Sequence, residues 1–479
     1  MTKLVHSGRP NPRVTVSALP DDVLLEVFGF CMEEEYGYGC DQVHQDKWLT
    51  LVHVCRRWRC VVFSSPRSLD LRLYCTPNTP VKKTLDIWPE LPVVIYSFNR
   101  GPRLPGVTNI MAALKQRNRV CKICIDGIPN SLLKKFAAMS TPFPALTDLE
   151  LLSTDENPPI LPDSFLGGSA PLLRDLGLYG VPFPALPKLL LSATNLVSLR
   201  VWQLPHSGYM SPDAIVTGLS ALTKLESLSL HFRSPRSQAN QQARLPPPLT
   251  RVVLPALARI SFTGDSKYLE DTVSRIDTPL LCEVDIKFFN QLAFNTPSLS
   301  HFISRTELFK APHRAHMIFS RLHVTVKLFH QNEVTDHRKF QLGISCDPLG
   351  WRPPSLVQMY NSSFPPFPTL EHLRIYEDQR AELQWQDYTG SAQWIALFHS
   401  FTSVKDLELS KNFVGFVAPA LGGLIGQQVT EVLPALQTIY LDGPQSSDTT
   451  TIHPAILQFV AARYSFGSHV GVQYQGRGN

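Results

Sequence analysis

The chain has 479 residues, of which 43% are hydrophobic and 18% are charged, and its formal net charge is +5. This composition is typical of a globular protein, and the length allows either several ordinary domains or one small domain followed by a long repetitive one. The positive charge is small for such a length and is not gathered into basic runs. Nucleic acid and anionic membranes are therefore not expected as partners.

Cysteine usage and the N-terminal residues indicate the cellular compartment. The nine cysteines are scattered without an even framework, and the first residues contain no apolar core of signal-peptide length. We therefore expect a reduced, intracellular location in the cytoplasm, the nucleus or both. The longest uncharged stretch, 412–430, is interrupted by glycines and a proline and falls short of a membrane span, so residues 416–429 are predicted to form a buried helix.

A short helix is predicted after a polar leader at residues 1–15. Pro20 suits the first helical position, and Asp21 and Asp22 place negative charge at the positive end of the helix. The apolar residues that follow recur at helical spacing over more than one face. The helix must therefore bury more than one side.

A second helical segment is predicted from Trp48 to Val62, with apolar residues on one side and a cluster of arginines at 56, 57 and 59 on the other. Two or three helices of this size cannot enclose a core alone. An apolar surface left outside such a module is expected to be covered by a partner.

The two segments, LPDDVLLEVF and LVHVCRRW, resemble the F-box, and the resemblance covers about residues 17–68. In that family a small helical trio docks on the Skp-type adaptor of an SCF ubiquitin ligase, which connects it to a cullin and a RING protein. The resemblance implies an F-box over residues 16–68. It assigns the adaptor-facing surface to Leu19, Pro20, Val23, Leu24, Val27, Phe28, Val54, Cys55 and Trp58.

One departure from the F-box pattern is a long connection at 31–47, which contains three consecutive glutamates and several glycines. A surface insertion costs little stability, because closure entropy grows slowly with loop length. It could nevertheless obstruct the adaptor. Two alternatives therefore stay open: a short helical hairpin that caps the next domain, and a leucine-rich scaffold without a cullin link.

Residues 69–479 contain a repeated unit of the form P-x-L-x-x-L-x-L. Successive first leucines from Leu146 to Leu281 are separated by 26, 24, 29, 32 and 24 residues, which is near the length of a leucine-rich repeat. Nine copies start at residues 144, 171, 194, 223, 255, 279, 368, 402 and 434. Earlier strands are predicted at 69–73, 92–98 and 120–125.

Helical patterns alternate with these strands, at 131–139, 213–222 and 392–401. The alternation predicts an α/β fold, an irregular right-handed leucine-rich-repeat solenoid with a concave parallel sheet. This part of the chain resembles the leucine-rich regions that follow F-boxes in mushroom-forming fungi. The motifs concerned are packing motifs, which identify an architecture and not a substrate.

The repeat lapses at about 290–365, although 321–329 and 339–345 still alternate as strands do. Either the repeats are degenerate there or the solenoid carries an insertion. The sequence does not decide between these two.

Target recognition is expected on the exposed side of the strands, because alternation in L-x-x-L-x-L sends the leucines into the core and the residues between them outward. Trp, Tyr and Arg dominate the energy of many protein interfaces. The predicted substrate-binding residues are Arg200, Trp202, His231, Arg259, Arg374, Tyr376 and Tyr440. The substrate is expected to be a protein.

Catalytic and metal motifs are weak in this sequence. Cys121 and Cys124 form a single C-x-x-C pair on a predicted strand, and His313 and His316 have no further ligands nearby in the sequence. No Gly-rich phosphate loop, G-x-S-x-G or H-E-x-x-H occurs. We therefore expect a non-catalytic adaptor without a cofactor or metal. An enzyme built on the solenoid would require a deep pocket with convergent polar groups.

Overall fold

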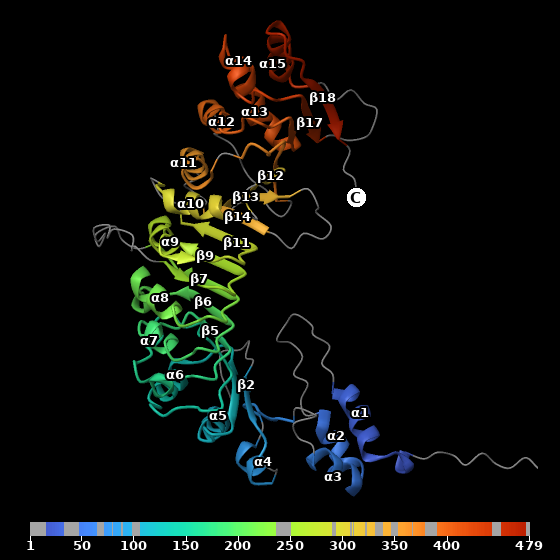
Figure 1. Cartoon of the computed structure of the whole chain (residues 1–479), viewed down its shortest axis with the longest axis vertical. Coiled ribbons are helices and arrows are strands. Elements are labelled where there is room, and N and C mark those ends of the chain that lie inside the picture. The colour runs from blue at the N-terminus through green and yellow to red at the C-terminus, as the bar shows by residue number, and fades with distance from the viewer. Residues whose placement is uncertain are drawn as a thin grey trace, which may run out of the picture. The chain divides into compact units, whose positions relative to one another are not determined.

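A computed structural model describes most of the chain (Figure 1). The described residues are 16–32, 47–64, 71–78, 80–87, 90–97, 106–235, 251–289, 294–306, 309, 311–320, 323–330, 339–345, 353–365, 367–378, 390–442 and 452–475. The chain divides into two compact units. Unit 1 comprises residues 1–127 and 143–148, and unit 2 comprises 128–142 and 149–479. The leader at 1–15 and most of the predicted insertion, 33–46, lie outside the described residues.

Unit 1 begins with a helical module. A 3-10 turn at Val16–Ala18 precedes α1 (Asp21–Met32), α2 (Lys47–Val54) and α3 (Arg56–Ser64). The helix predicted at 48–62 is thus two helices, which are separated at Cys55. Arg57 of α3 fastens the start of α1: its guanidinium donates to the Leu19 carbonyl at 2.5 Å and to the Asp21 carboxylate at 2.7 Å.

Trp48 connects this module to the chain that follows it. Its side chain is 1% exposed and packs edge-on against Phe63, with ring centroids 5.9 Å apart. The indole N–H donates to the Arg72 carbonyl at 2.9 Å, which satisfies the polar end of a buried Trp. The predicted boundary at 68/69 therefore falls inside unit 1, between α3 and the first strand.

The rest of unit 1 alternates strands and helices. Strands β1 (Leu73–Cys75), β2 (Val93–Ser97) and β3 (Val120–Ile125) pair in parallel in this order. Helices α4 (Val81–Ile87) and α5 (Val107–Leu114) connect them. β2 and β3 correspond to the strands predicted at 92–98 and 120–125, whereas β1 begins at Leu73, the last residue of the strand predicted at 69–73.

Unit 2 continues the same alternation. Its sheet has the order β4-β5-β6-β7-β9-β11-β14-β13-β12-β15-β16-β17-β18. The strands are β4 (Asp148–Leu152), β5 (Asp175–Tyr179), β6 (Ser198–Leu204), β7 (Ser227–Phe232), β9 (Arg259–Gly264), β11 (Glu283–Phe288), β12 (Arg314–Phe319), β13 (His323–Phe329), β14 (Lys339–Ser345), β15 (His372–Glu377), β16 (Asp406–Leu409), β17 (Thr438–Asp442) and β18 (Gly471–Gln475). A separate parallel pair is formed by β8 (Val252–Val253) and β10 (Ile276–Asp277).

Helices line one face of this sheet (Figure 1). They are α6 (Asn130–Ala137), α7 (Leu186–Leu190), α8 (Pro212–Leu219), α9 (Ser266–Val273), α10 (Pro297–Arg305), α11 (Pro353–Ser363), α12 (Ser391–Phe398), α13 (Lys411–Gly422), α14 (Gln428–Glu431) and α15 (Pro454–Ser465). The helices predicted at 131–139, 213–222 and 392–401 are α6, α8 and α12. The helix predicted at 416–429 is α13, which is largely buried but begins earlier and ends at Gly422.

The repeated leucines form the core, as the alternation predicts. Along β5 and β6, Leu176 pairs with Leu199 and Leu178 with Val201, and each is at most 2% exposed. Identical positions thus stack from one strand to the next, and each repeat buries its apolar residues against its neighbours. The chain has the predicted α/β architecture, a mostly parallel sheet with helices in leucine-rich-repeat-like units. None of the helices in the described ranges has both the length and the hydropathy that a membrane-spanning segment requires.

The interval at 290–365 contains an insertion within the sheet. β12 and β14 run parallel to their neighbours β15 and β11, whereas β13 lies between them and is antiparallel to both. β12 and β13 are separated by three residues, which is too short for a helical return. The repeat pattern lapses here because a meander of adjacent strands replaces the strand-helix unit.

A buried carboxylate connects two neighbouring repeats. Glu270 of α9 is 5% exposed, and its two oxygens accept from the backbone N–H groups of Ser298 at 2.6 Å and Leu299 at 2.9 Å. These donors belong to the first turn of α10, where N–H groups have no partner within the helix. The preceding repeat therefore supplies the cap of α10, since the side chain of Thr296 makes no capping bond.

Replacing Glu270 with alanine is expected to destabilise the protein by about 2–4 kcal/mol, because one buried and one partly buried N–H group lose a charged acceptor. The loss is measurable as a lower urea midpoint of unfolding by circular dichroism. The exposed helical Glu431 offers the matched control, and Glu431→Ala should change the free energy of unfolding by less than about 0.5 kcal/mol. Equal effects of the two changes would contradict the capping role.

Candidate functional site

Helix α1 has two apolar stripes, one buried and one exposed. Leu24 and Phe28 are 1% and 0% exposed, and the Phe28 ring lies 4.8 Å from the Trp58 ring. Both residues thus hold the helices together, which corrects their predicted place on an adaptor-facing surface. Val23 and Val27 are 39% and 44% exposed and lie four residues apart on the outer side of the helix.

The outer stripe of α1 continues to Phe30, which is 69% exposed and lies beyond the F-box-like segment LPDDVLLEVF. Among the other predicted adaptor-facing residues, Val54 is 58% exposed, Pro20 and Cys55 are exposed, and Leu19 and Trp58 are half-buried. We call Val23, Val27 and Phe30 the outer apolar patch. Exposed apolar patches are frequent at interaction surfaces, so this patch is a candidate docking surface.

The second candidate surface is the face of the unit 2 sheet opposite its helices, which we call the open face. Its side chains alternate with the buried leucines along each strand. The seven predicted substrate-binding residues all lie at such alternate positions. Trp202, Arg259 and Arg374 are exposed, and Arg200, His231, Tyr376 and Tyr440 are half-buried.

Three of these strands contribute an aromatic cluster. Tyr179, Trp202 and His231 come from β5, β6 and β7. The Trp202 ring lies 5.4 Å from the Tyr179 ring in an edge-on arrangement and stacks on the His231 ring at 4.9 Å. The Nε2 atom of His231 lies 2.8 Å from the Ser261 hydroxyl on β9. The open face therefore presents a continuous aromatic surface over several repeats.

Trp202 projects from an irregularity in the sheet. The β6–β7 register shifts between Val201 and Leu204, and Gln203 has φ 50°, in the left-handed region that L-residues other than Asn and Asp avoid. A bulge of this kind directs a side chain out of the regular ladder. Trp202 remains 38% exposed although it packs on two neighbouring rings.

Gly177 makes room for a polar group beside the aromatic cluster. A Cβ atom there would lie 3.1 Å from the Tyr179 ring and 3.2 Å from the Glu150 side chain. Both Glu150 and Arg200 contribute to the environment of Tyr179, although burial is the main cause that raises the pKa of its hydroxyl. Arg200 pairs in register with Gly177, and its Nε atom is buried without a hydrogen-bond partner among the described residues.

Besides the aromatic cluster, the open face has a polar cluster on β12, β15 and β16. Arg374 forms an ion pair with Glu408 at 3.0 Å, and its guanidinium lies 4.9 Å from the centroid of the Tyr376 ring. His316 adds a further ring contact to Tyr376 at 5.8 Å. Tyr440 pairs in register with Glu408, whereas Arg259 lies apart on β9, between Ser227 and Glu283.

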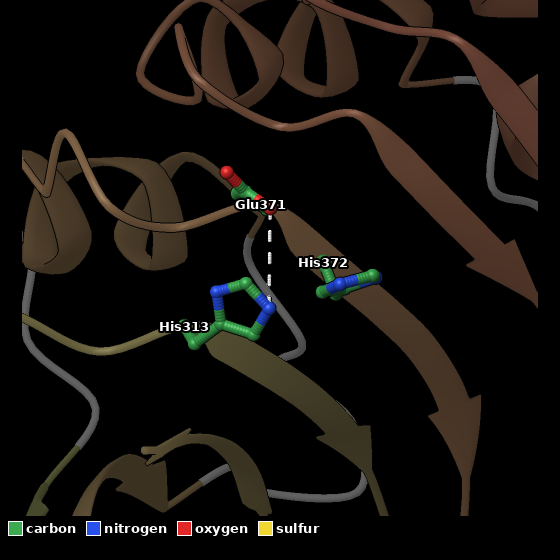
Figure 2. A group of neighbouring side chains, drawn as sticks. All are labelled: His313, Glu371 and His372. Carbon is green, nitrogen blue, oxygen red and sulfur yellow. Dashed lines mark ion pairs between the residues drawn. The ribbon is translucent and has the colours of Figure 1, made fainter. Parts of the chain in front are cut away.

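A group with metal-ligand chemistry lies where β12 and β15 begin (Figure 2). His313, Glu371 and His372 each offer one ligand atom, and these atoms all lie within 4.8 Å of one another. The ring centroids of the two histidines are 4.8 Å apart. Burial lowers the pKa of His372, and a hydrogen bond from Lys405 lowers the pKa of Glu371.

No sequence motif indicates this group, because His313 is far from Glu371 and His372 in the chain. His313 was considered with His316, but His316 contacts Phe329 and Tyr376 instead. The parallel pairing of β12 with β15 brings Glu371 and His372 to His313. Neither thiol of the C-x-x-C pair is in a disulfide: Cys121 is half-buried, and Cys124 is buried.

Comparisons with known proteins give no family and only remote structural likenesses. No family model matches the chain, and no curated protein matches it either. Among solved structures, the leucine-rich repeat-containing protein LegL7 from Legionella pneumophila is 13% identical with a TM-score of 0.26, and the alignment covers 85% of this chain and 91% of LegL7. A structure of TLR13 in complex with ssRNA13 is 13% identical with a TM-score of 0.23, covering 76% of this chain and 47% of the other.

The aromatic cluster makes stability dependent on pH. Burial, aided by the charge of Lys287, lowers the pKa of His231 from 6.5 to about 4. Between these values the unfolded chain binds a proton that the folded chain does not, so stability falls as the pH drops from 6.5 towards 4. His231→Gln is expected to remove about 3 kcal/mol of this dependence.

Urea unfolding followed by tryptophan fluorescence between pH 4 and 7 measures the effect. The exposed His399 provides the control, since His399→Gln should not alter how the free energy of unfolding changes with pH. If the free energy of unfolding changes with pH in the same way after His231→Gln, other groups cause the acid sensitivity.

Proposed function

We propose that this chain is a non-catalytic substrate-recruiting subunit of an SCF-type ubiquitin ligase. In this proposal the helical module docks on the Skp-type adaptor, which connects it to the cullin and the RING protein. The open face of the repeat sheet holds a target protein. Ubiquitin transfer is then promoted by effective concentration, which brings target lysines to a separately bound conjugating enzyme.

The outer apolar patch carries the proposal. A three-helix module that buries Leu24, Phe28 and Trp48 has used these large residues for its own packing. It still exposes Val23, Val27 and Phe30 along one side of α1. Keeping apolar surface in contact with water costs a free energy of about 25 cal/mol per Å². Docking of the outer apolar patch on a partner would remove this cost. The partner is proposed from the resemblance of LPDDVLLEVF, which contains Val23 and Val27, to the F-box.

The first test replaces Val27 with aspartate in the full chain and measures binding to a purified Skp-type adaptor by calorimetry. A carboxylate in the middle of a desolvated apolar contact is expected to weaken binding at least a hundredfold. Val27 is 44% exposed, so the fold should persist. Phe28→Asp is unsuitable because it would unfold the module.

Val253→Asp is the matched control, because Val253 is 54% exposed on the short β8–β10 pair of unit 2. It should leave adaptor binding unchanged. Absence of binding by the unmodified chain would instead favour a leucine-rich scaffold without a cullin link. Binding that survives Val27→Asp and Phe30→Asp together would mean that another face contacts the adaptor.

The second part of the proposal places the target on the open face. Trp202 and Arg374 are of the residue types that most often dominate interface energy, and both are exposed on that face. They are also held in place: Trp202 stacks on His231, and Arg374 lies between Glu408 and Tyr376. Side chains ordered before binding lose less conformational entropy when a partner arrives.

Affinity purification of the full chain from cells with the proteasome blocked tests this part. Trp202→Ala is expected to weaken the affinity for the target about thirtyfold and so to reduce its recovery. Recovery of the adaptor should stay constant. Ile425→Ala is the control, since Ile425 is 81% exposed between α13 and α14. Parallel loss of adaptor and target would indicate misfolding and not a lost contact.

A further inference from the structure

Three groups of zinc-ligand type meet at the start of two adjacent strands of unit 2. His313 precedes β12, while Glu371 and His372 lie where β15 begins (Figure 2). The backbone fixes their proximity, because the N–H groups of Glu371 and His372 both donate to the His313 carbonyl, at 3.0 and 3.2 Å. The three side chains therefore start from neighbouring points of one ladder.

The side-chain distances suit a metal ion after small rotations. His313 Nε2 lies 3.9 Å from Glu371 Oε2, and one ligand atom from each of the three residues lies within 4.8 Å of the others. Zn²⁺ binds histidine nitrogen and carboxylate oxygen at 2.0–2.2 Å, so tetrahedral ligands are roughly 3.4 Å apart. The widest separation that the group allows, 4.8 Å, would have to close by roughly 1.4 Å to reach this spacing.

Two neighbours, Lys405 just before β16 and Asp406 at its first position, orient the ligands. His372 Nδ1 lies 2.8 Å from Asp406 Oδ2. When the ring proton is on Nδ1, the carboxylate accepts it, and the metal would then be bound through Nε2. Metal-binding histidines commonly have such a carboxylate partner, which fixes the tautomer and raises ligand basicity. The Lys405 ammonium lies 2.6 Å from Glu371 Oε1, so the other oxygen, Oε2, remains directed at His313.

From this geometry we propose that His313, Glu371 and His372 bind one Zn²⁺ ion, with Asp406 as the carboxylate that orients His372. Two imidazoles and a carboxylate form a ligand set that suits zinc, and water completes four-coordination. The site fastens β12 to β15, where the meander joins the regular repeats. It is independent of the adaptor-binding proposal.

The test uses the full chain, stripped with a chelator and titrated with zinc chloride against a chromophoric competitor. One equivalent of zinc should bind, and His313→Ala with His372→Ala should remove that equivalent. His316→Ala is the matched control, because His316 lies on the same strand but contacts Phe329 and Tyr376. It should leave the affinity unchanged.

Asp406→Asn provides a second variant that alters no ligand. It is expected to weaken zinc binding about ten- to a hundredfold, the usual effect of losing an outer carboxylate. Cobalt substitution should give the intense visible bands of a four-coordinate ion, and these should disappear in the double histidine variant. Zinc binding that survives the double change would assign it to other groups, such as the exposed thiols of Cys31, Cys55 and Cys60, and would overturn the proposal. So would the absence of stoichiometric binding by the unmodified chain.

Discussion

The structure depends on the burial of one leucine row by the next. A strand such as β5 has Leu176 and Leu178 on the helix side, and neither can leave water until β6 supplies Leu199 and Val201 at the same level. The parallel ladder fixes this correspondence, because a shift by one residue would turn every leucine to the opposite face. Stability therefore accumulates repeat by repeat, and the residues between the leucines are left free to vary.

That freedom explains why the open face can specialise. The core positions keep one chemistry across the sheet, whereas the alternate positions hold Trp202 and His231 in one region and Arg374 and Glu408 in another. The same division operates in the helical module, where Leu24 and Phe28 face inward and Val23 and Val27 face outward. In both units the buried apolar residues fix the backbone, and the backbone in turn positions the exposed residues between them.

The sequence predicted the strands and helices well wherever the period was regular. Leucine spacing alone located β5, β6 and β7, because burial imposes the same spacing on each repeat. It could not predict that β13 runs backwards, since alternation in 321–329 defines a strand but not its direction. The F-box resemblance placed Phe28 on the outside, and the helical periodicity could not correct this, because it shows that α1 is apolar on two sides without showing which side packs on α3.

Side-chain groups from distant segments were beyond sequence analysis. His313 is 58 residues from Glu371, and only the pairing of β12 with β15 brings them together. The capping of α10 by Glu270 cannot be predicted for the same reason, since the sequence of α9 does not show that its glutamate accepts hydrogen bonds from another helix. The residue types were visible in advance, but their partners depended on the order of strands in the sheet.

The reversed strand also affects how the sheet bends. Neighbouring strands lie about 4.8 Å apart and packed helices about 8–10 Å apart, so a unit with one helix per strand is wider on its helical side and acts as a wedge. Three residues between β12 and β13 leave one strand without its own helix. Large rings occupy the space instead, with Phe340 packed against Phe309 and Phe364 at 5.1 and 5.4 Å. The wedge is thinner there, and we expect the meander to be the flattest stretch of the sheet in unit 2.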